Sequence, residues 1–244
     1  MSITWIASFD IGKKNFSFYI EEFDSNIIKS LKNIPKQTRF NNNGTPTPTF
    51  NNILTDIYKT GTKILLENVD LTHGCNPKSY LDINILYNMT NLLDKYSNYW
   101  DQCDIFVIEK QMSFGKNYNT MALKLGQHCW SYFALRYPMT DPMTDPMLEI
   151  PIHIVEFPAY YKTQILGAAK IEKHNKSGKI SYKAVDKPTR KKWCITKALD
   201  ILNLREDIST TTIITKSKKK DDLCDVICQL QAFKYCYFID KCLE

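Results

Sequence analysis

The sequence has 244 residues and a net charge of +6, from 32 basic and 26 acidic side chains. Hydrophobic residues make up 43% and charged residues 24%, which favours a packed core and excludes a wholly disordered chain. No apolar run approaches the roughly 20 residues that span a bilayer, and the N-terminus lacks the pattern of a secretory signal. We expect an intracellular protein that is not secreted and does not contact membranes, and its charge suits a polyanionic partner.

The first part of the chain predicts strands of one sheet. Apolar, β-rich runs at 3–10 and 15–22 indicate a hairpin, and a third strand is expected at 63–71. The segment 24–62 between them is polar, rich in Asn, Thr and Pro, and has no period. It is interpreted as a surface excursion on the sheet.

The remainder of the chain alternates helices and strands. The predicted elements are a helix at 79–100, a strand at 104–111, a helix at 119–137, a repeat-containing spacer at 138–150, a strand at 151–157, a short helical segment after Pro158, a basic polar stretch at 170–187, and helices at 188–203 and from 221 to the C-terminus. This order predicts an α/β fold in a single domain, residues 1–244.

Two acidic residues end predicted strands. Asp10 follows the first apolar run, and Gly12 two residues later leaves room for a ligand to approach the backbone. Glu109 ends a strand expected to be buried, where an unpaired carboxylate would be costly. Each has a plain alternative, because Asp10 could start a turn and Glu109 could form a salt bridge, for example to Lys110.

Further carboxylates begin the last predicted helix. Asp222 and Asp225 are three residues apart and point from the same face, and Asp221 is expected to cap the helix. Two negative charges on one face repel each other, but a divalent cation between them makes the electrostatic energy favourable. The alternative is a capped, solvated helix start.

The four acids Asp10, Glu109, Asp222 and Asp225 together supply hard oxygen ligands from three remote segments. Such a set suits Mg²⁺, with Mn²⁺ as a substitute. Two ions about 4 Å apart can activate a water and stabilise the leaving oxygen of a phosphodiester. No histidine or cysteine motif competes, and the eight cysteines are expected to be reduced core thiols.

Three ordered blocks of the sequence resemble Holliday junction resolvases of the RuvC and poxvirus kind, in the ribonuclease H-like superfamily. The blocks are SFDIGKKNFSFYIEE, VIEKQMSFGKNYNTMALKLGQ and KKKDDLCDVICQ. The resemblance implies a ribonuclease H-like fold with a five-stranded mixed sheet flanked by helices. It also implies that the four acids named above are the metal-binding catalytic residues.

The resemblance extends to residues that would contact DNA. It implies that Lys162 and Lys191 approach the scissile phosphate and that Phe114, with Met112 as a rival, stacks on a base. Lys116, Arg190 and Lys192 are also expected to contact DNA. Further lysines near these in sequence could hold phosphates by charge or form a solvated surface: 183, 187, 216 and 218–220. The sequence departs from the family at Lys110, where Gln is usual, and in insertions at 25–60 and 138–150.

The implied function is a structure-selective endonuclease. It would resolve four-way DNA junctions by paired hydrolytic nicks that leave 5′-phosphate ends, in viral recombination and concatemer processing in the host cytoplasm. Paired nicks require a homodimer, expected through helix 119–137, where Ala122, Gly126 and Cys129 allow close approach and Trp130 and Phe133 add apolar area. The alternative is that these residues cover the sheet.

Two other functions are compatible with parts of the pattern. Asp-Ile-Gly also opens actin-like ATPases and sugar kinases, but those need a second such domain and a second phosphate loop. A non-catalytic protein that binds branched DNA on the same fold would use the basic surface without needing all four acids.

Overall fold

A computed structural model of the chain describes residues 2–76, 78–111, 119–138, 152–174 and 179–243. Two compact units make up the protein. The sheet unit consists of Thr4–Glu22 and Lys63–Ala159, and the helical unit consists of Met1–Ile3, Phe23–Thr62 and Tyr160–Glu244. The single domain and the insertions expected from the sequence stay predictions, and the spacer at 139–150 lies outside the described residues. No helix in the described ranges is both long enough and apolar enough to cross a membrane.

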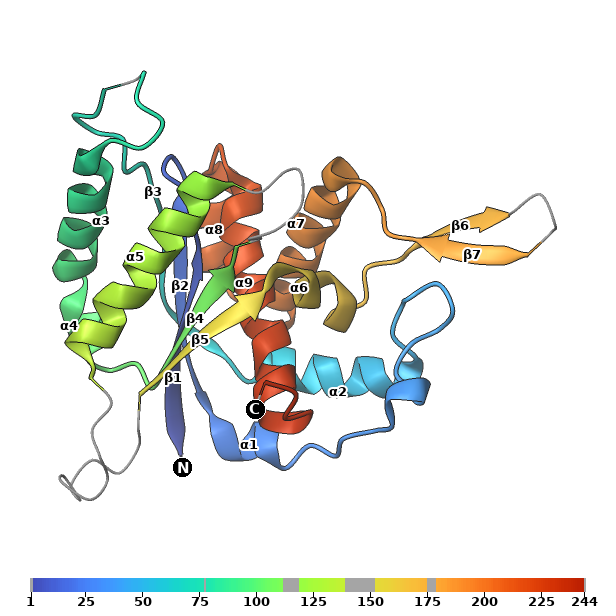
Figure 1. Ribbon diagram of the computed structural model, residues 1–244. Coiled ribbons are helices and arrows are strands. Elements are labelled where there is room, and N and C mark those ends of the chain that lie inside the picture. Colours follow the sequence, from blue (N-terminus) through green and yellow to red (C-terminus); the bar gives the residue numbers. More distant parts are fainter. Residues whose placement is uncertain (1, 77, 112–118, 139–151, 175–178, 244) are drawn as a thin grey trace. The chain divides into compact units, whose positions relative to one another are not determined.

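A mixed five-stranded sheet forms the framework of the sheet unit, in the order β3-β2-β1-β4-β5 (Figure 1). Its strands are β1 (Ile3–Asp10), β2 (Phe16–Asp24), β3 (Thr62–Val69), β4 (Ile105–Lys110) and β5 (His153–Pro158). β4 runs parallel to both of its neighbours, β1 and β5. All five strands fall where the sequence predicts them, and the predicted ribonuclease H-like α/β fold class is confirmed.

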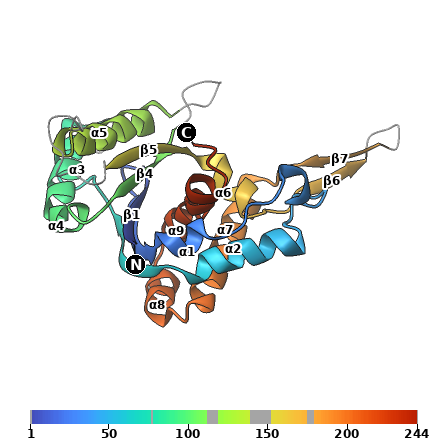
Figure 2. The same ribbon diagram turned by 90° about the horizontal axis from the view of Figure 1, so that it is seen from below.

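Aromatic side chains fill the core between the sheet and the helices of its unit. Phe9 of β1 has five aromatic neighbours with ring centroids 5.2–6.5 Å away: Phe16, Phe18, Trp100, Phe106 and Phe133. Helices α3 (Ile83–Lys95), α4 (Ser97–Trp100) and α5 (Thr120–Arg136) lie on one side of the strands in both views (Figures 1 and 2). The helix predicted at 79–100 is therefore shorter and interrupted, because Asp82 caps α3 at its start and Tyr96 separates α3 from α4.

Helix α5 covers the sheet with the face that the sequence assigned to a dimer contact. Its buried residues are Ala122, Leu125, Gly126, Cys129 and Phe133. Phe133 stacks on Phe106 of β4 with centroids 4.1 Å apart. The alternative interpretation, that these residues cover the sheet, is thus confirmed for this face. Trp130 and Leu135 remain 38% and 83% exposed, and the homodimer itself stays a prediction.

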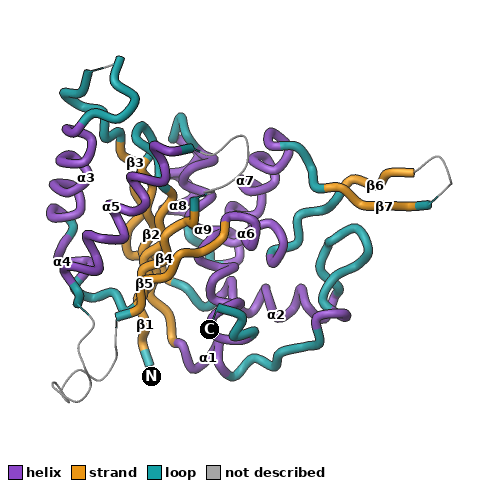
Figure 3. Tube along the Cα trace, viewed as in Figure 1, coloured by secondary structure: helices purple, strands orange, loops and turns teal. Residues whose placement is uncertain are grey.

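The helical unit is built around one long buried helix. Its elements are α1 (Ser25–Lys29), a 3₁₀ turn (Lys36–Thr38), α2 (Pro48–Lys59), α6 (Ala159–Ile165), β6 (Ile171–His174), β7 (Ile180–Lys183), α7 (Lys187–Leu204), α8 (Ile208–Lys216), α9 (Lys220–Lys234) and a π-helical turn (Tyr235–Ile239). α7 packs along α9, and α2 and α8 each contact both of these helices. Figure 3 shows these helices and the β6–β7 hairpin.

Four features of this unit differ from what the sequence predicted. The segment 24–62 contains helix α2, whose residues Phe50, Leu54, Ile57 and Tyr58 are buried at helical spacing. The stretch 170–187 forms a β-hairpin, and α8 was not predicted at all. The last helix does not stay α-helical to the C-terminus, because it changes to a π-helical turn after Lys234. In each case a short element depends on packing or pairing that local composition does not reveal.

Substituting Phe9 tests the aromatic core. Phe9→Ala removes a ring that is fully buried among five others, so the free energy of unfolding should fall by about 3–5 kcal/mol. Urea unfolding followed by circular dichroism measures this loss. Leu135→Ala is the control, because Leu135 is 83% exposed and its truncation should cost less than about 0.5 kcal/mol. Similar losses in both variants would contradict the packing described here.

Candidate active site

The sheet unit places two of the predicted acids side by side. Phe9 of β1 is opposite Ile108 of β4, so Asp10 and Glu109 hold the next positions of two neighbouring parallel strands. The four residues before each acid are buried, whereas both acids are only partly buried. The carboxylates therefore lie where the two central strands leave the core, an edge at which α/β sheets commonly bind ligands.

The structure gives Gly12 and Lys110, which lie close to these acids in the sequence, contacts beyond those expected. A Cβ on Gly12 would lie 2.9 Å from the carbonyl oxygen of Asn15, so the tight turn between β1 and β2 requires glycine without any ligand. Lys110 pairs with Glu156, with 3.9 Å between Nζ and Oε2, and both side chains are more than half exposed. Lys110 is therefore a weak surface partner of Glu156, and its suggested pairing with Glu109 stays a prediction.

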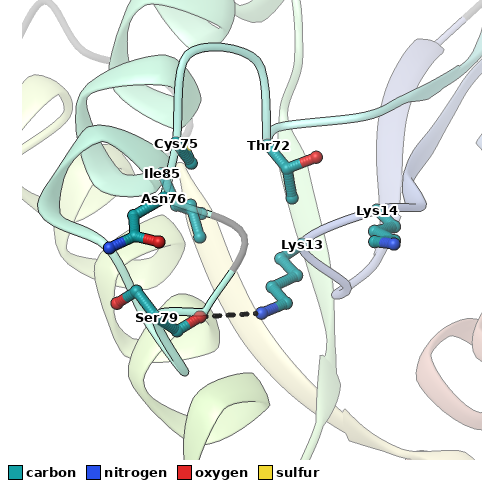
Figure 4. Close-up of a pocket in the computed structure, with 7 residues that line it drawn as sticks. All are labelled: Lys13, Lys14, Thr72, Cys75, Asn76, Ser79 and Ile85. Carbon is teal, nitrogen blue, oxygen red and sulfur yellow. Dashed lines mark hydrogen bonds between the residues drawn. The ribbon is translucent and has the colours of Figure 1, made fainter.

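A small polar pocket adjoins the turn after Asp10. Its lining includes Lys13 and Lys14 from the turn and Thr72, Asn76 and Ser79 from the segment after β3 (Figure 4). Nζ of Lys13 donates hydrogen bonds to the carbonyl oxygens of Ser79, at 3.5 Å, and Tyr80, at 3.0 Å. The two lysines were not singled out from the sequence, although a Gly-Lys-Lys run directly after Asp10 could have marked positive charge there.

In the helical unit, a buried ion pair holds one acid of α9. Nζ of Lys162 on α6 lies 3.2 Å from Oδ1 of Asp225, and the two side chains are 8% and 23% exposed. The thiol of Cys194 on α7 donates to the same oxygen at 2.9 Å. Losing either charge would leave the other without its partner in a region of low exposure, which is costly. No sequence signal marked Cys194, which had been read as an ordinary core thiol; all eight cysteines are indeed free, and six are buried.

A second ion pair lies one helical turn earlier, between Lys191 of α7 and Asp221 of α9. Burial alone would raise the pKa of Asp221, but the hydrogen bond and charge of Lys191 outweigh it, and the net pKa is lowered. The same hydrogen bond raises the pKa of Lys191 and keeps its ammonium charged. The prediction that Asp221 caps the helix was wrong: Lys219 holds the N-cap position, and Asp221 lies in the first turn.

Asp222 stands between these two ion pairs and belongs to neither. Its Oδ2 is shielded from solvent and has no hydrogen-bond partner among the described residues. Burial raises its pKa, and the negative charge of Asp221 raises it further. A buried carboxylate oxygen of this kind is a suitable donor for a hard divalent cation, so the donor chemistry of this chain fits the ion implied by the sequence.

The remaining predicted DNA contacts separate into exposed and undescribed residues. Arg190 and Lys192 are exposed on α7. Met112, Phe114 and Lys116 lie outside the described residues.

The predicted acids come as two pairs, Asp10 with Glu109 in the sheet unit and Asp222 with Asp225 in the helical unit. Within the described residues, no three His, Cys, Asp or Glu side chains are grouped to hold a metal ion. A site that joins the two pairs therefore stays a prediction.

The mixed sheet in the order β3-β2-β1-β4-β5, flanked by helices, has the ribonuclease H-like arrangement of an α/β protein. No protein-family model matches the sequence. The chain is 34% identical over 257 residues to uncharacterized protein 170L of Invertebrate iridescent virus 6. This alignment covers 97% of this chain and 91% of that protein. It is 26% identical over 235 residues to uncharacterized protein 97L of Invertebrate iridescent virus 3, covering 94% and 98%. The chain belongs to the family of protein 170L.

Solved structures with a similar chain path come from fowlpox virus. One is the fowlpox virus resolvase in complex with substrate Holliday junction DNA, at 14% identity and a TM-score of 0.48, covering 99% of this chain and 100% of that one. Another is the fowlpox virus Holliday junction resolvase, at 12% identity and a TM-score of 0.43, covering 95% and 98%.

Asp222→Asn should make the metal-free protein more stable. Because the pKa is raised on folding, the native state holds the Asp222 proton more tightly than the unfolded chain does. That stabilisation is present below the ordinary aspartate pKa and is lost as pH rises through the raised native pKa. At pH 7 in EDTA, Asn at this position should therefore raise Tm by about 2–4 °C, and the gain should shrink towards zero below about pH 4.

Scanning fluorimetry across pH measures this gain. Asp56→Asn serves as a control, because Asp56 is an exposed aspartate on α2 of the same unit and its substitution should leave Tm unchanged. A destabilised Asp222→Asn protein at pH 7 would show that the carboxylate has a stabilising partner, contrary to the geometry.

Proposed function

We propose that this protein is a structure-selective DNA endonuclease that resolves four-way junctions by metal-dependent hydrolysis. The observation that carries the proposal is the arrangement of the acids in two pairs, one at the ends of neighbouring parallel strands and one on α9. In the α9 pair, an oxygen of Asp222 is buried with no hydrogen-bond partner in the described part of the chain. Structural carboxylates are normally paired or solvated, and leaving such an oxygen unsatisfied costs stability. Such a cost is typical of functional sites.

Asp10, Glu109, Asp222 and Asp225 would hold two divalent cations, Mg²⁺ or Mn²⁺. When bound, such a pair of ions supplies an activated water and neutralises charge on the leaving oxygen of a phosphodiester. This chemistry would give a 5′-phosphate and a 3′-hydroxyl at each nick. All four donors are hard carboxylate oxygens, as these ions prefer.

The lysines of the helical unit orient two of the acidic side chains and leave carboxylate oxygens available to a metal ion. Lys162 and the Cys194 thiol both bond Oδ1 of Asp225, which fixes the orientation of the carboxylate and leaves Oδ2 as the oxygen offered to a cation. Lys191 keeps its positive charge through Asp221 while its side chain stays 41% exposed. The exposed Arg190 and Lys192 beside it on α7 can attract a phosphate group.

Resolution of a four-way junction needs two opposed nicks, so the proposal includes a two-fold dimer with one active site per protomer. The face of α5 that carries Ala122, Gly126 and Cys129 is buried within the protomer and cannot supply the contact. The exposed side of α5, with Trp130 and Leu135, is the part of this helix still open to a partner. The viral relatives fit a role in viral DNA recombination and concatemer processing.

Cleavage of a labelled four-way junction tests the proposed activity. With Mg²⁺, the protein should make paired nicks bearing 5′-phosphates in the junction and none in a matched linear duplex, and EDTA should abolish them. Glu109→Gln and Asp222→Asn should each lower the cleavage rate by roughly 10²–10³-fold while binding persists. Asp56→Asn should cleave normally. Tight binding of the junction without cleavage in either Mg²⁺ or Mn²⁺ would instead establish a non-catalytic branched-DNA-binding protein.

Metal binding can be measured without DNA. If the two pairs of acids form one site, saturating Mg²⁺ at about 100 times its Kd should stabilise the protein by about 2.7 kcal/mol, and the rise in Tm should be lost in both Glu109→Gln and Asp222→Asn. Scanning fluorimetry against Mg²⁺ concentration gives this shift. If Asp222→Asn abolishes the shift and Glu109→Gln leaves it intact, then the pairs do not act together.

A further inference from the structure

The basic stretch 170–187 forms an arm that the proposed active site does not use. We call β6 (Ile171–His174) and β7 (Ile180–Lys183) the β6–β7 arm. It extends away from α6 and α7 in both views (Figures 1 and 2). All of its strand residues are exposed except Tyr182, which is partly buried. An element with so little buried surface contributes little to the core, so its role is to be sought at the surface.

The base of the arm is held firmly by the loop before α2. The backbone N–H of Lys170 donates to the carbonyl oxygen of Asn43 at 2.7 Å. Gly44 has φ +83°, and a Cβ there would lie 3.2–3.4 Å from the side-chain carbons of Lys170. Gly167 has φ +78°, and a Cβ there would come within 2.2 Å of Pro46. These contacts anchor the first strand where it leaves the helical unit.

The register of the arm sorts its charges onto different faces. Residues directly opposite each other in an antiparallel pair point to the same side. Ile171 pairs with Lys183 and Lys173 with Ser181, so one face carries two lysines and no acid. Glu172, His174, Ile180 and Tyr182 share the other face. There, Glu172 accepts a contact from Nε2 of His174 at 2.9 Å.

The acidic residues of this stretch are therefore engaged away from the lysine face. Asp186, the other acid between positions 170 and 187, caps α7 by accepting from the backbone N–H of Thr189 at 2.9 Å. Positive charge then continues along the chain into α7, where Lys187 and Arg190 are both exposed and three residues apart. The arm and the first turn of α7 form a run of positive charge that ends at Lys191.

An exposed two-stranded ribbon with lysines and no acid on one face is suited to binding duplex DNA. The major groove of B-DNA is wide enough to admit a two-stranded β-ribbon, and lysines on one face of such a ribbon can contact phosphates without regard to sequence. We propose that the β6–β7 arm binds a duplex arm of the DNA substrate, with Lys173 and Lys183 on the phosphate backbone. The inference rests on the proposed function for the identity of the substrate, but it concerns a surface separate from the acids.

The test compares Lys173→Gln/Lys183→Gln with the control Lys32→Gln/Lys36→Gln, which removes two exposed lysines elsewhere in the helical unit. Binding to a labelled four-way junction and to a linear duplex is measured by fluorescence anisotropy in EDTA at several salt concentrations. The arm variant should bind both DNAs roughly 5–30-fold more weakly, and the slope of log K against log salt should fall in magnitude by about 1.8, the value for two lost phosphate contacts. The control should match the wild-type protein.

Several outcomes would overturn the inference. An unchanged Kd and salt slope in the arm variant would do so, as would an equal loss in the control. A change in molar mass by light scattering with an unchanged salt slope would assign the arm to contact between chains instead. Cleavage of the junction is assayed separately in Mg²⁺. A protein that never cleaves but shows the expected salt dependence would refute the proposed nuclease and leave the DNA-binding arm intact.

Discussion

Strands β1 and β4 are buried on both faces, and this burial determines where Asp10 and Glu109 can lie. Residues Ile6–Phe9 and Ile105–Ile108 are buried, so no charged side chain could occupy either run without a large desolvation cost. The first positions that tolerate a carboxylate are Asp10 and Glu109, where the strands reach partial exposure. Parallel pairing then brings both acids to the same edge of the sheet. The geometry of this pair is thus a consequence of core formation, and needs no interaction between the acids themselves.

In the helical unit, three carboxylates crowd the start of one largely buried helix. Three aspartates fall within the first two turns of α9, and the helix is almost wholly buried from Leu223 onward. Lys191 and Lys162 each neutralise one of them, at Asp221 and Asp225. The middle acid, Asp222, belongs to neither ion pair, and burial, together with the negative charge of Asp221, raises its pKa. Burying a carboxylate outside any ion pair costs stability, which a fold selected for stability alone would avoid.

The sequence was informative where apolar pattern and burial coincide. Strands β1 and β4 appear as largely apolar runs. Helix α7 begins at Lys187 with Pro188 in its first turn, as its sequence indicates. Sequence interpretation failed where an element is short or depends on distant packing. Helix α2 carries Phe50, Leu54, Ile57 and Tyr58 at helical spacing, yet the Asn- and Thr-rich surroundings masked that period. Likewise, the Lys162–Asp225–Cys194 contacts join three segments, and no local signal specifies such a cluster.

The segment 24–62 was interpreted as a surface excursion because its contacts are with residues distant in the sequence. In the structure it anchors other elements of the helical unit. Its loop supplies Asn43 and Gly44 to the base of the β6–β7 arm, and α2 packs on both α7 and α9. An isolated two-stranded hairpin is at best marginally stable in water, so the arm needs an anchor in the body of the helical unit. The polar loop provides one through a backbone hydrogen bond and through close contacts that require glycine at positions 44 and 167. A segment with weak sequence pattern can therefore position a charged surface, because the contacts that matter are made by the main chain.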